Sequence, residues 1–382
     1  MPLLPHASQH AQRTTEEMIR HMQSFSLDLQ FSAGVWFFFP AGLRFHEPYG
    51  PRGSIEQILT RAAQLKDAGL SAIEAHYPNE INEHNLPLYQ DFIRDTGIRL
   101  LTVIPNLFYD ACWEWGSLSN PIPEVRAAAI QRTREALQLN QELGTDFAVV
   151  WPGIDGYENS FGLDLPAMRR RFNTGLAAAL DAVPGVRIAL EPKPYEPRGR
   201  ILVPTTSDGL LCCRNVEAAL TSTTNQDILG RGIPLMGLNP EIGHLLMAYE
   251  DPASSLSLCM EEGRLFHTHW NSQPLGNYDQ DLDVGVISPE LGEAALYALK
   301  MGGYTGYFGI DIFPERLPVE RALINSFDAL RAMNDRIEHL DHEKVLRCQE
   351  RPDKNRGYLE ALLLRARARD AGKLSPLPEF ED

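Results

Sequence analysis

Eight short apolar runs alternate with amphipathic segments along this chain, and this alternation restricts the possible folds more than any other feature. The runs are rich in Val, Ile, Leu and Phe, and they span residues 33–39, 71–76, 99–106, 146–151, 186–193, 234–240, 265–271 and 304–311. Continuous apolar strands separated by helices are typical of a parallel sheet covered on both faces. Eight such units predict a closed (β/α)8 barrel, the TIM-barrel fold.

The amphipathic segments carry signals for helix boundaries. Ser54 and Gln57 have the spacing of a capping box at the start of a helix predicted over 54–68. A second helix is predicted over 124–143 and is followed by Gly144, a residue suited to a left-handed C-cap. An open, doubly wound sheet is the competing architecture. It is disfavoured because the first apolar run lacks the G-x-G-x-x-G turn typical of that fold.

Beyond the eight units the chain changes character. We predict an N-terminal extension over 1–30, a catalytic barrel over 31–337 and a C-terminal helical tail over 338–382. The tail is charged and has too few apolar residues for a core of its own. We therefore expect it to pack on a neighbouring subunit, with the basic run RARARD at Arg365 forming a solvated face or an intersubunit salt bridge.

The composition excludes several classes of partner. With 35 Lys and Arg against 51 Asp and Glu, the net charge is -16, and the sequence has no basic stripe that would attract nucleic acid against this field. No apolar run reaches the roughly 18 residues of a membrane helix, and the first residues lack a secretory signal. We expect a cytoplasmic protein without a membrane partner. The five cysteines form no C-x-x-C pair and are predicted to fill core space.

Polar residues gather at the predicted carboxyl ends of the strands, where TIM barrels place their chemistry. They are His76, Asn106, Glu191, Lys193, Glu241, His244, His269, Asn271 and Asp311, with Asp279 and Asp281 in the seventh loop. Two bare carboxylates about 4 Å apart would repel by about 4 kcal/mol at an effective dielectric constant of 20. A divalent cation removes that cost, and oxygen ligands with an imidazole suit Mg²⁺, Mn²⁺ or Co²⁺. The alternative is a set of salt bridges to arginines across the barrel top.

Four motifs occur in the order found in one known family. They are EPKPYEPRGRILVPT from Glu191, NPEIGH from Asn239, LFHTHWN from Leu265 and YDQDLDVG from Tyr278. With these motifs the chain resembles the xylose isomerases over almost the whole barrel, from GVW at Gly34 to GIDIF at Gly309. The chain is identified as a divergent member of that family.

The resemblance implies two metal sites and a sugar pocket. The implied first site consists of Glu191, Glu241, His269 and Asp311, and the second uses Glu241 as a bridge with His244, Asp279 and Asp281. Lys193 is implied to hydrogen-bond the carbonyl oxygen of the substrate, and His76 to help open the sugar ring. The implied substrate-binding residues are Trp36, Phe108 and Trp151, which form apolar walls, and Asn271. As core residues, the three aromatics would need no function at all.

This chain departs from the family's motifs at four positions. His269 and Asn79 each stand where the family has an aspartate, Phe313 where it has a lysine, and Tyr195 where it has an asparagine. An amide at position 79 is expected to weaken His76 as an acid or base, because a carboxylate partner stabilises the histidine cation. The nearby Glu80 and Glu83 are expected to be surface residues. The set of three acids and one histidine resembles the one-metal site of ketose epimerases and rhamnose-type isomerases.

The expected activity is interconversion of an aldose and a ketose, with one or two Mn²⁺ or Mg²⁺ ions, or Co²⁺, per chain. A second hypothesis is a metal-dependent lyase or epimerase acting on a keto-sugar or oxidised glycoside through an enediolate. A third is a sugar-binding barrel without catalysis, and a barrel nuclease is disfavoured by the net charge. The expected partners are a small sugar or glycoside and further copies of the chain, in a dimer or tetramer. Trp113, Trp115 and the aromatics after Trp36 are assigned either to an aglycone site or to a subunit interface.

Overall fold

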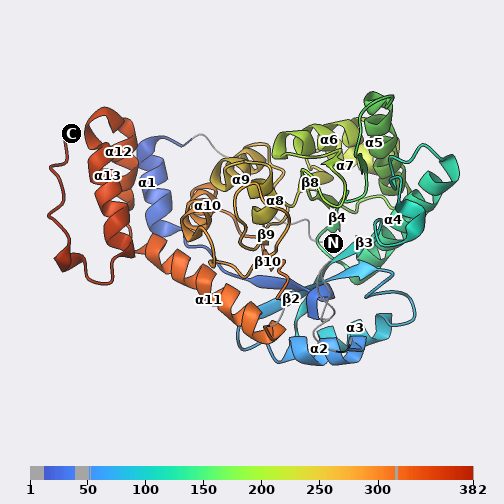
Figure 1. Cartoon of the computed structure of the whole chain (residues 1–382), viewed down its shortest axis with the longest axis horizontal. Coiled ribbons are helices and arrows are strands. Elements are labelled where there is room, and N and C mark those ends of the chain that lie inside the picture. Colours follow the sequence, from blue (N-terminus) through green and yellow to red (C-terminus); the bar gives the residue numbers. More distant parts are fainter. Residues whose placement is uncertain (1–12, 39–50, 52, 315–316, 382) are drawn as a thin grey trace.

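A computed structural model describes residues 13–38, 51, 53–314 and 317–381 (Figure 1). The strands are β1 Phe31–Gly34, β2 Leu70–Tyr77, β3 Arg99–Pro105, β4 Ala148–Val150, β5 Gly156–Tyr157, β6 Ile188–Leu190, β7 Arg200–Ile201, β8 Met236–Leu238, β9 His269–Trp270 and β10 Phe308–Ile310. The helices are α1 Thr15–Ser24, α2 Ile55–Ala63, α3 Leu86–Thr96, α4 Pro123–Leu143, α5 Leu165–Ala182, α6 Thr206–Ala218, α7 Thr223–Gly230, α8 Ile242–Met247, α9 Pro252–Glu261, α10 Pro289–Gly302, α11 Val319–Glu338, α12 His342–Glu350 and α13 Pro352–Arg367.

Eight parallel strands form a barrel, and β5 and β7 form a separate antiparallel pair. One arc of the barrel has the order β3-β2-β1-β10-β9, and the other has the order β4-β6-β8. The first and last barrel strands pair directly, with Phe31 opposite Phe308. Isolated parallel bridges join β8 to the chain around β9, at Leu238 with Leu265 and at Glu241 with His269. The (β/α)8 barrel predicted from the apolar runs is confirmed.

The two arcs of the barrel meet a second time between β3 and β4, where these strands form no regular ladder and side chains bridge the gap. The Val103 N–H donates to Asn140 Oδ1 at 2.9 Å, and Asn140 Nδ2 donates to the Val103 carbonyl at 2.8 Å. On the β4 side, the Val149 N–H donates to Thr102 Oγ1 at 2.8 Å. A buried asparagine on α4 therefore satisfies backbone groups that a neighbouring strand would otherwise satisfy.

The hydrophobic core has two layers, as expected for a barrel whose interior is packed. The larger layer lies between the strands and the surrounding helices. The smaller layer fills the barrel itself and consists of Ala72, Leu101, Ile104, Phe147, Val149, Ala189 and Phe266. This inner layer forms a solid floor beneath the strand ends, so the barrel has a mouth on that side and no pore.

Each predicted apolar run overlaps a strand, but the first run was placed too late in the sequence. The strand is Phe31–Gly34, and the chain then enters a 3-10 turn over Trp36–Phe38 instead of continuing; Phe39 lies outside the described residues. The turn buries Phe37 and Phe38, so these aromatics belong to the core and not to an aglycone site. The Ser54 capping box is confirmed, although α2 ends at Ala63. Gly144 is the left-handed C-cap of α4.

The tail packs on its own chain. Helices α12 and α13 lie beside α1 at one end of the molecule, next to α10 and α11 (Figure 1). Arg347 on α12 pairs with Glu16 on α1 at 2.8 Å, and Arg367 in the RARARD run pairs with Glu293 on α10 at 2.9 Å. The basic run therefore has an intrachain partner, and α1 shows that part of the N-terminal extension is folded. A subunit contact for this region stays a prediction.

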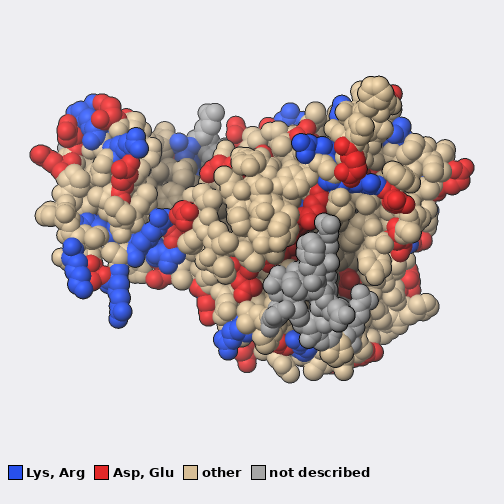
Figure 2. Space-filling view, viewed as in Figure 1, with Lys and Arg blue, Asp and Glu red and all other residues tan. Residues whose placement is uncertain are grey.

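Lysines and arginines are interspersed with acidic residues over both the barrel and the tail on the face in Figure 2. No helix in the described part of the chain is long and apolar enough to cross a membrane.

Candidate active site

A cavity of about 370 Å³ opens at the carboxyl ends of the barrel strands. Its lining contains every predicted site residue except Asn271: Trp36, His76, Phe108, Trp151, Glu191, Lys193, Glu241, His244, His269, Asp279, Asp281 and Asp311, together with Ile104, Val149, Ile312 and Phe313. The parallel barrel explains this gathering, because it directs every strand's carboxyl end to the same mouth.

The four side chains of the implied first metal site face one another. Glu191, Glu241, His269 and Asp311 each offer one ligand atom, and these four atoms all lie within 4.8 Å of one another. Opposite ligands of an octahedral cation are about 4.2 Å apart, twice a metal–oxygen distance of about 2.1 Å. The four donors therefore need only small movements to contact one shared ion.

A second group of donors shares Glu241. Glu241, His244 and Asp279 also offer ligand atoms within 4.8 Å of one another. Asp281, expected to belong to this site, lines the cavity but lies outside that group. Asn271 Nδ2 donates to both Glu241 Oε1 and Asp281 Oδ1 at 2.8 Å, so Asn271 holds two acids in place from behind the cavity wall.

Several buried polar atoms around these groups have no hydrogen-bond partner. They are His244 Nδ1, His269 Nδ1, Asp279 Oδ1, Asn239 Oδ1 and Asn271 Oδ1. A buried polar atom without a partner is costly, and clusters of such atoms in a native site call for a ligand, ion or water. Because carboxylate and imidazole donors surround them, the residues fit a hard or borderline divalent cation.

Crowded charges perturb the acids of the cluster. Burial and the neighbouring carboxylates raise the pKa of Glu241 well above its usual value, and the same causes raise the pKa of Asp311 to about 6. Burial would also raise the pKa of Asp279, but Lys193 and His244 outweigh it and lower that pKa. Such repulsion between like charges is relieved either by protons or by a cation.

Arginines do not neutralise the cluster among the described residues. The ion pairs recorded there for Glu191, Glu241 and Asp311 are with His244 and His269. Lys193 Nζ instead donates to Asp279 Oδ2 at 2.5 Å and lies 5.1 Å from the centroid of the Trp151 ring. The alternative of arginine salt bridges across the barrel top is therefore wrong for this part of the chain.

One wall of the cavity is a continuous row of rings. The ring centroids of Trp36 and His76 are 4.5 Å apart, those of His76 and Phe108 are 5.6 Å apart, and those of Phe108 and Trp151 are 4.7 Å apart. Trp36 Nε1 also donates to Asp311 Oδ1 at 3.1 Å, which ties the wall to the acidic cluster. An apolar wall opposite convergent polar groups is a common arrangement in pockets for small molecules.

His76 has a carboxylate partner that the sequence analysis missed. Glu80 Oε2 accepts hydrogen bonds from His76 Nδ1 at 2.9 Å and from the His76 backbone N–H at 2.6 Å, and the Glu80 side chain is only 12% exposed. The expectation that Glu80 is a surface residue is wrong, and so is the expectation that Asn79 leaves His76 without a carboxylate. The turn after β2 brings a residue one position further along into contact with the imidazole.

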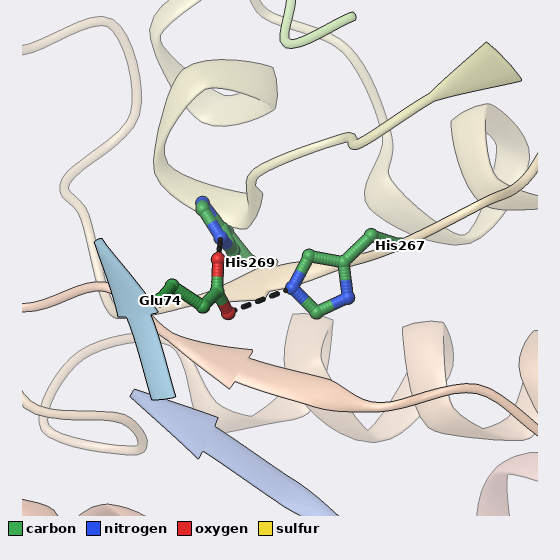
Figure 3. A group of neighbouring side chains, drawn as sticks. All are labelled: Glu74, His267 and His269. Carbon is green, nitrogen blue, oxygen red and sulfur yellow. Dashed lines mark hydrogen bonds and ion pairs between the residues drawn. The ribbon is translucent and has the colours of Figure 1, made fainter. Parts of the chain in front are cut away.

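Two more residues beneath the cavity were missed. Glu74 Oε1 lies 3.0 Å from His267 Nε2, and Glu74 Oε2 lies 3.1 Å from His269 Nε2 (Figure 3). The signal was present, because alternate residues of a strand face the same side. Glu74 precedes His76 by two positions, and His267 precedes His269 by two.

The remaining departures from the family motifs have distinct surroundings. Phe313 lines the cavity, and Tyr195 Oη donates to the Asn277 carbonyl at 2.7 Å, in the loop that carries Asp279. Trp113 is buried in the hydrophobic core and does not line the cavity, so its assignment to an aglycone site or an interface is wrong. Trp115 is 65% exposed, and the Arg198 guanidinium lies 5.6 Å from its ring centroid. For Trp115, an aglycone site and a subunit interface both stay predictions.

The fold and the site together define a parallel β/α barrel with an acid- and histidine-lined pocket at the carboxyl ends of its strands. A model of the xylose isomerase-like TIM barrel family matches residues 62–333, and the chain belongs to this family. A xylose isomerase of Thermus thermophilus is 29% identical over 291 residues, which cover 72% of this chain and 70% of that protein.

Solved structures agree with the fold. A D-tagatose 3-epimerase-like protein superposes with a TM-score of 0.59 and 18% identity over 81% of this chain and 98% of that one. The IolI protein, solved with a bound zinc atom, gives a TM-score of 0.58 and 15% identity over 81% of this chain and 99% of that one. At these identities the likeness concerns the fold alone.

Proposed function

We propose that this protein is a divalent-metal-dependent sugar isomerase that interconverts an aldose and a ketose. The observation that carries the proposal is the convergence of Glu191, Glu241, His269 and Asp311 around partnerless buried atoms, opposite a wall of aromatic rings. The family and the identity to a xylose isomerase support it. The ion would be Mn²⁺ or Mg²⁺, with Co²⁺ as a further candidate, held by these four residues.

The chemistry that such a cation supplies is polarisation of the sugar's carbonyl and hydroxyl oxygens by a Lewis acid. The chain's own residues bind and orient the sugar. Trp36, Phe108 and Trp151 would cover its C–H face. Lys193, held by Asp279, would donate a hydrogen bond to the carbonyl oxygen of the open chain.

Ring opening is assigned to His76. The carboxylate of Glu80 accepts a hydrogen bond from the Nδ1–H of His76. Nε2 is then the nitrogen that would accept a proton from a sugar hydroxyl. The carboxylate also stabilises the imidazolium that results. The His76 and Glu80 pair thus supplies the function that Asn79 lacks.

A second candidate is an epimerase or lyase that removes the proton next to a carbonyl and forms an enediolate. It is favoured by the presence of one complete set of four donors, in which His269 takes a carboxylate position of the resembled family, while Asp281 stays outside the second group. The substituted pocket residue Phe313 also points to a different substrate, such as a keto-sugar or an oxidised glycoside.

One experiment separates these candidates. The metal content of the purified protein is determined, and the Mn²⁺-loaded or Mg²⁺-loaded protein is incubated with a panel of free sugars and keto-glycosides in D₂O. Isomerisation without deuterium in the product supports the isomerase, with hydrogen passing directly from one sugar carbon to the next as a hydride. Deuterium at the reacting carbon supports the enediolate. Sugar binding without conversion overturns both and favours the non-catalytic barrel.

A further inference from the structure

Glu74 is a buried carboxylate in the middle of β2, and the proposed function assigns it no role. Its side chain is 1% exposed, and both of its oxygens are occupied (Figure 3). Oε1 accepts from Ser32 Oγ at 2.7 Å and lies 3.0 Å from His267 Nε2, and Oε2 lies 3.1 Å from His269 Nε2. Since an ionised carboxylate only accepts, both imidazoles must donate from Nε2.

The contact with Glu74 decides which nitrogen of His269 faces the acidic cluster. Because Nε2 of His269 faces Glu74, Nδ1 faces the acidic cluster, 3.1 Å from Glu191 Oε2 and 3.4 Å from Asp311 Oδ2. This Nδ1 atom is buried and has no hydrogen-bond partner. An imidazole that carries its proton on Nε2 presents a lone pair on Nδ1, which is the form needed to bind a cation.

The requirement is specific to a histidine. A carboxylate at position 269, as in the resembled family, would present lone pairs in any orientation. An imidazole has two neutral forms, and only one of them can act as a ligand through Nδ1. The replacement therefore needs an acceptor at Nε2, and Glu74 is the acceptor in this chain.

Two features separate this cluster from a cation site of its own, although Glu74, His267 and His269 offer three donor atoms close together. Both Nε2 atoms are at hydrogen-bond distance from an oxygen of Glu74, so each contact is satisfied by a proton on the imidazole without an ion. The space is also closed by Gly309 on β10, where an added Cβ would lie 2.6 Å from His267 Nε2 and 3.0 Å from Glu74 Oε1.

We propose that Glu74 is a positioning residue that fixes His269 with Nε2 protonated and Nδ1 free to bind the divalent cation. This inference rests on the proposed function, because it assumes a cation held by Glu191, Glu241, His269 and Asp311. Glu74 itself touches neither the ion nor the sugar. It acts through the orientation and the protonated nitrogen of His269.

The test is a Mn²⁺ titration of Glu74→Leu, with free Mn²⁺ followed by electron paramagnetic resonance. A leucine of similar size accepts no hydrogen bond, so His269 Nε2 loses the acceptor that fixes the proton there. We expect the dissociation constant for Mn²⁺ to rise about 10- to 100-fold, the usual effect of losing an outer partner of a metal-binding histidine. Ser32→Ala is the matched control, because it removes one contact of the same carboxylate and leaves both imidazole contacts in place. Its affinity should stay within about twofold of wild type.

A second measurement needs no variant. Nitrogen-15 NMR of the Mg²⁺-loaded wild-type protein should find the proton of His269 on Nε2 and none on Nδ1. A proton on Nδ1, or equal Mn²⁺ affinity of folded Glu74→Leu and wild type, overturns the role of Glu74 alone. If wild-type protein binds no Mn²⁺, the cation site and the proposed function fail, and the inference fails with them.

Discussion

Replacing Glu241 with glutamine should make the metal-free protein more stable than metal-free wild type. The same replacement should reduce the stability that the protein gains from bound metal. Glu241 is shared by both donor groups, and its side chain is only 2% exposed. Burial and the acids around it raise its pKa well above the usual value. A neutral amide at this position removes a repulsive charge, but it also removes a ligand.

The size of the effect follows from the repulsion between the buried carboxylates. Two like charges at the 4.8 Å limit of the donor groups repel by about 3.5 kcal/mol at an effective dielectric constant of 20. For 382 residues the entropy of unfolding is about 0.8 kcal/mol/K, so a gain of about 3 kcal/mol raises the melting temperature by about 4 °C.

The assay is thermal unfolding at pH 7 in EDTA and then in excess Mn²⁺, for wild type, Glu241→Gln and the surface control Glu142→Gln. In EDTA, Glu241→Gln should melt above wild type, while the control should stay unchanged. In Mn²⁺, wild type should gain stability by mass action, and Glu241→Gln should gain much less. The reasoning is refuted if Glu241→Gln melts below wild type in EDTA, or if Mn²⁺ stabilises both proteins equally.

Three further outcomes are expected. The pKa of Asp311 is raised to about 6 from 3.8, so the metal-free folded state binds a proton that the unfolded chain releases. The free energy of unfolding should therefore fall by up to about 3 kcal/mol as the pH rises from about 4 to 6. Urea unfolding in EDTA should show this fall in wild type, and an equal fall in Asp311→Asn would contradict the prediction. Glu80→Gln should lower kcat/KM for a cyclic sugar by roughly 100-fold, because His76 loses its carboxylate partner. The same assay is run with a substrate that needs no ring opening. Equal losses of kcat/KM on both substrates would exclude a role in ring opening. Asn140→Ala should lower the free energy of unfolding, measured in urea, by about 2 to 4 kcal/mol, because two buried backbone groups of Val103 lose their partner. A change below about 1 kcal/mol would mean that these groups find other partners.

Local sequence patterns were sufficient to predict the barrel and the polar residues at its mouth. The apolar runs have the length and spacing of buried parallel strands, and any closed parallel barrel places the residues that follow its strands at one mouth. For this reason Glu191, Glu241, His269 and Asp311 could be expected at one mouth before their positions in space were known, while the resemblance to xylose isomerases implied that they form one metal site. The capping box at Ser54 is local chemistry and was equally readable.

Contacts between distant segments were decided only by the tertiary structure. Glu80 reaches His76 because the turn after β2 folds back, and a one-residue shift in such a turn is invisible to a strand pattern. Glu74 lies between His267 and His269 only because β2 and the chain before β9 face each other across the barrel interior. The tail lies against α1 and α10 of its own chain, since charged helices with few apolar residues give no local sign of the surface they will cover. Periodicity fixes which side of a strand a residue occupies, whereas its partner there depends on how the whole chain closes.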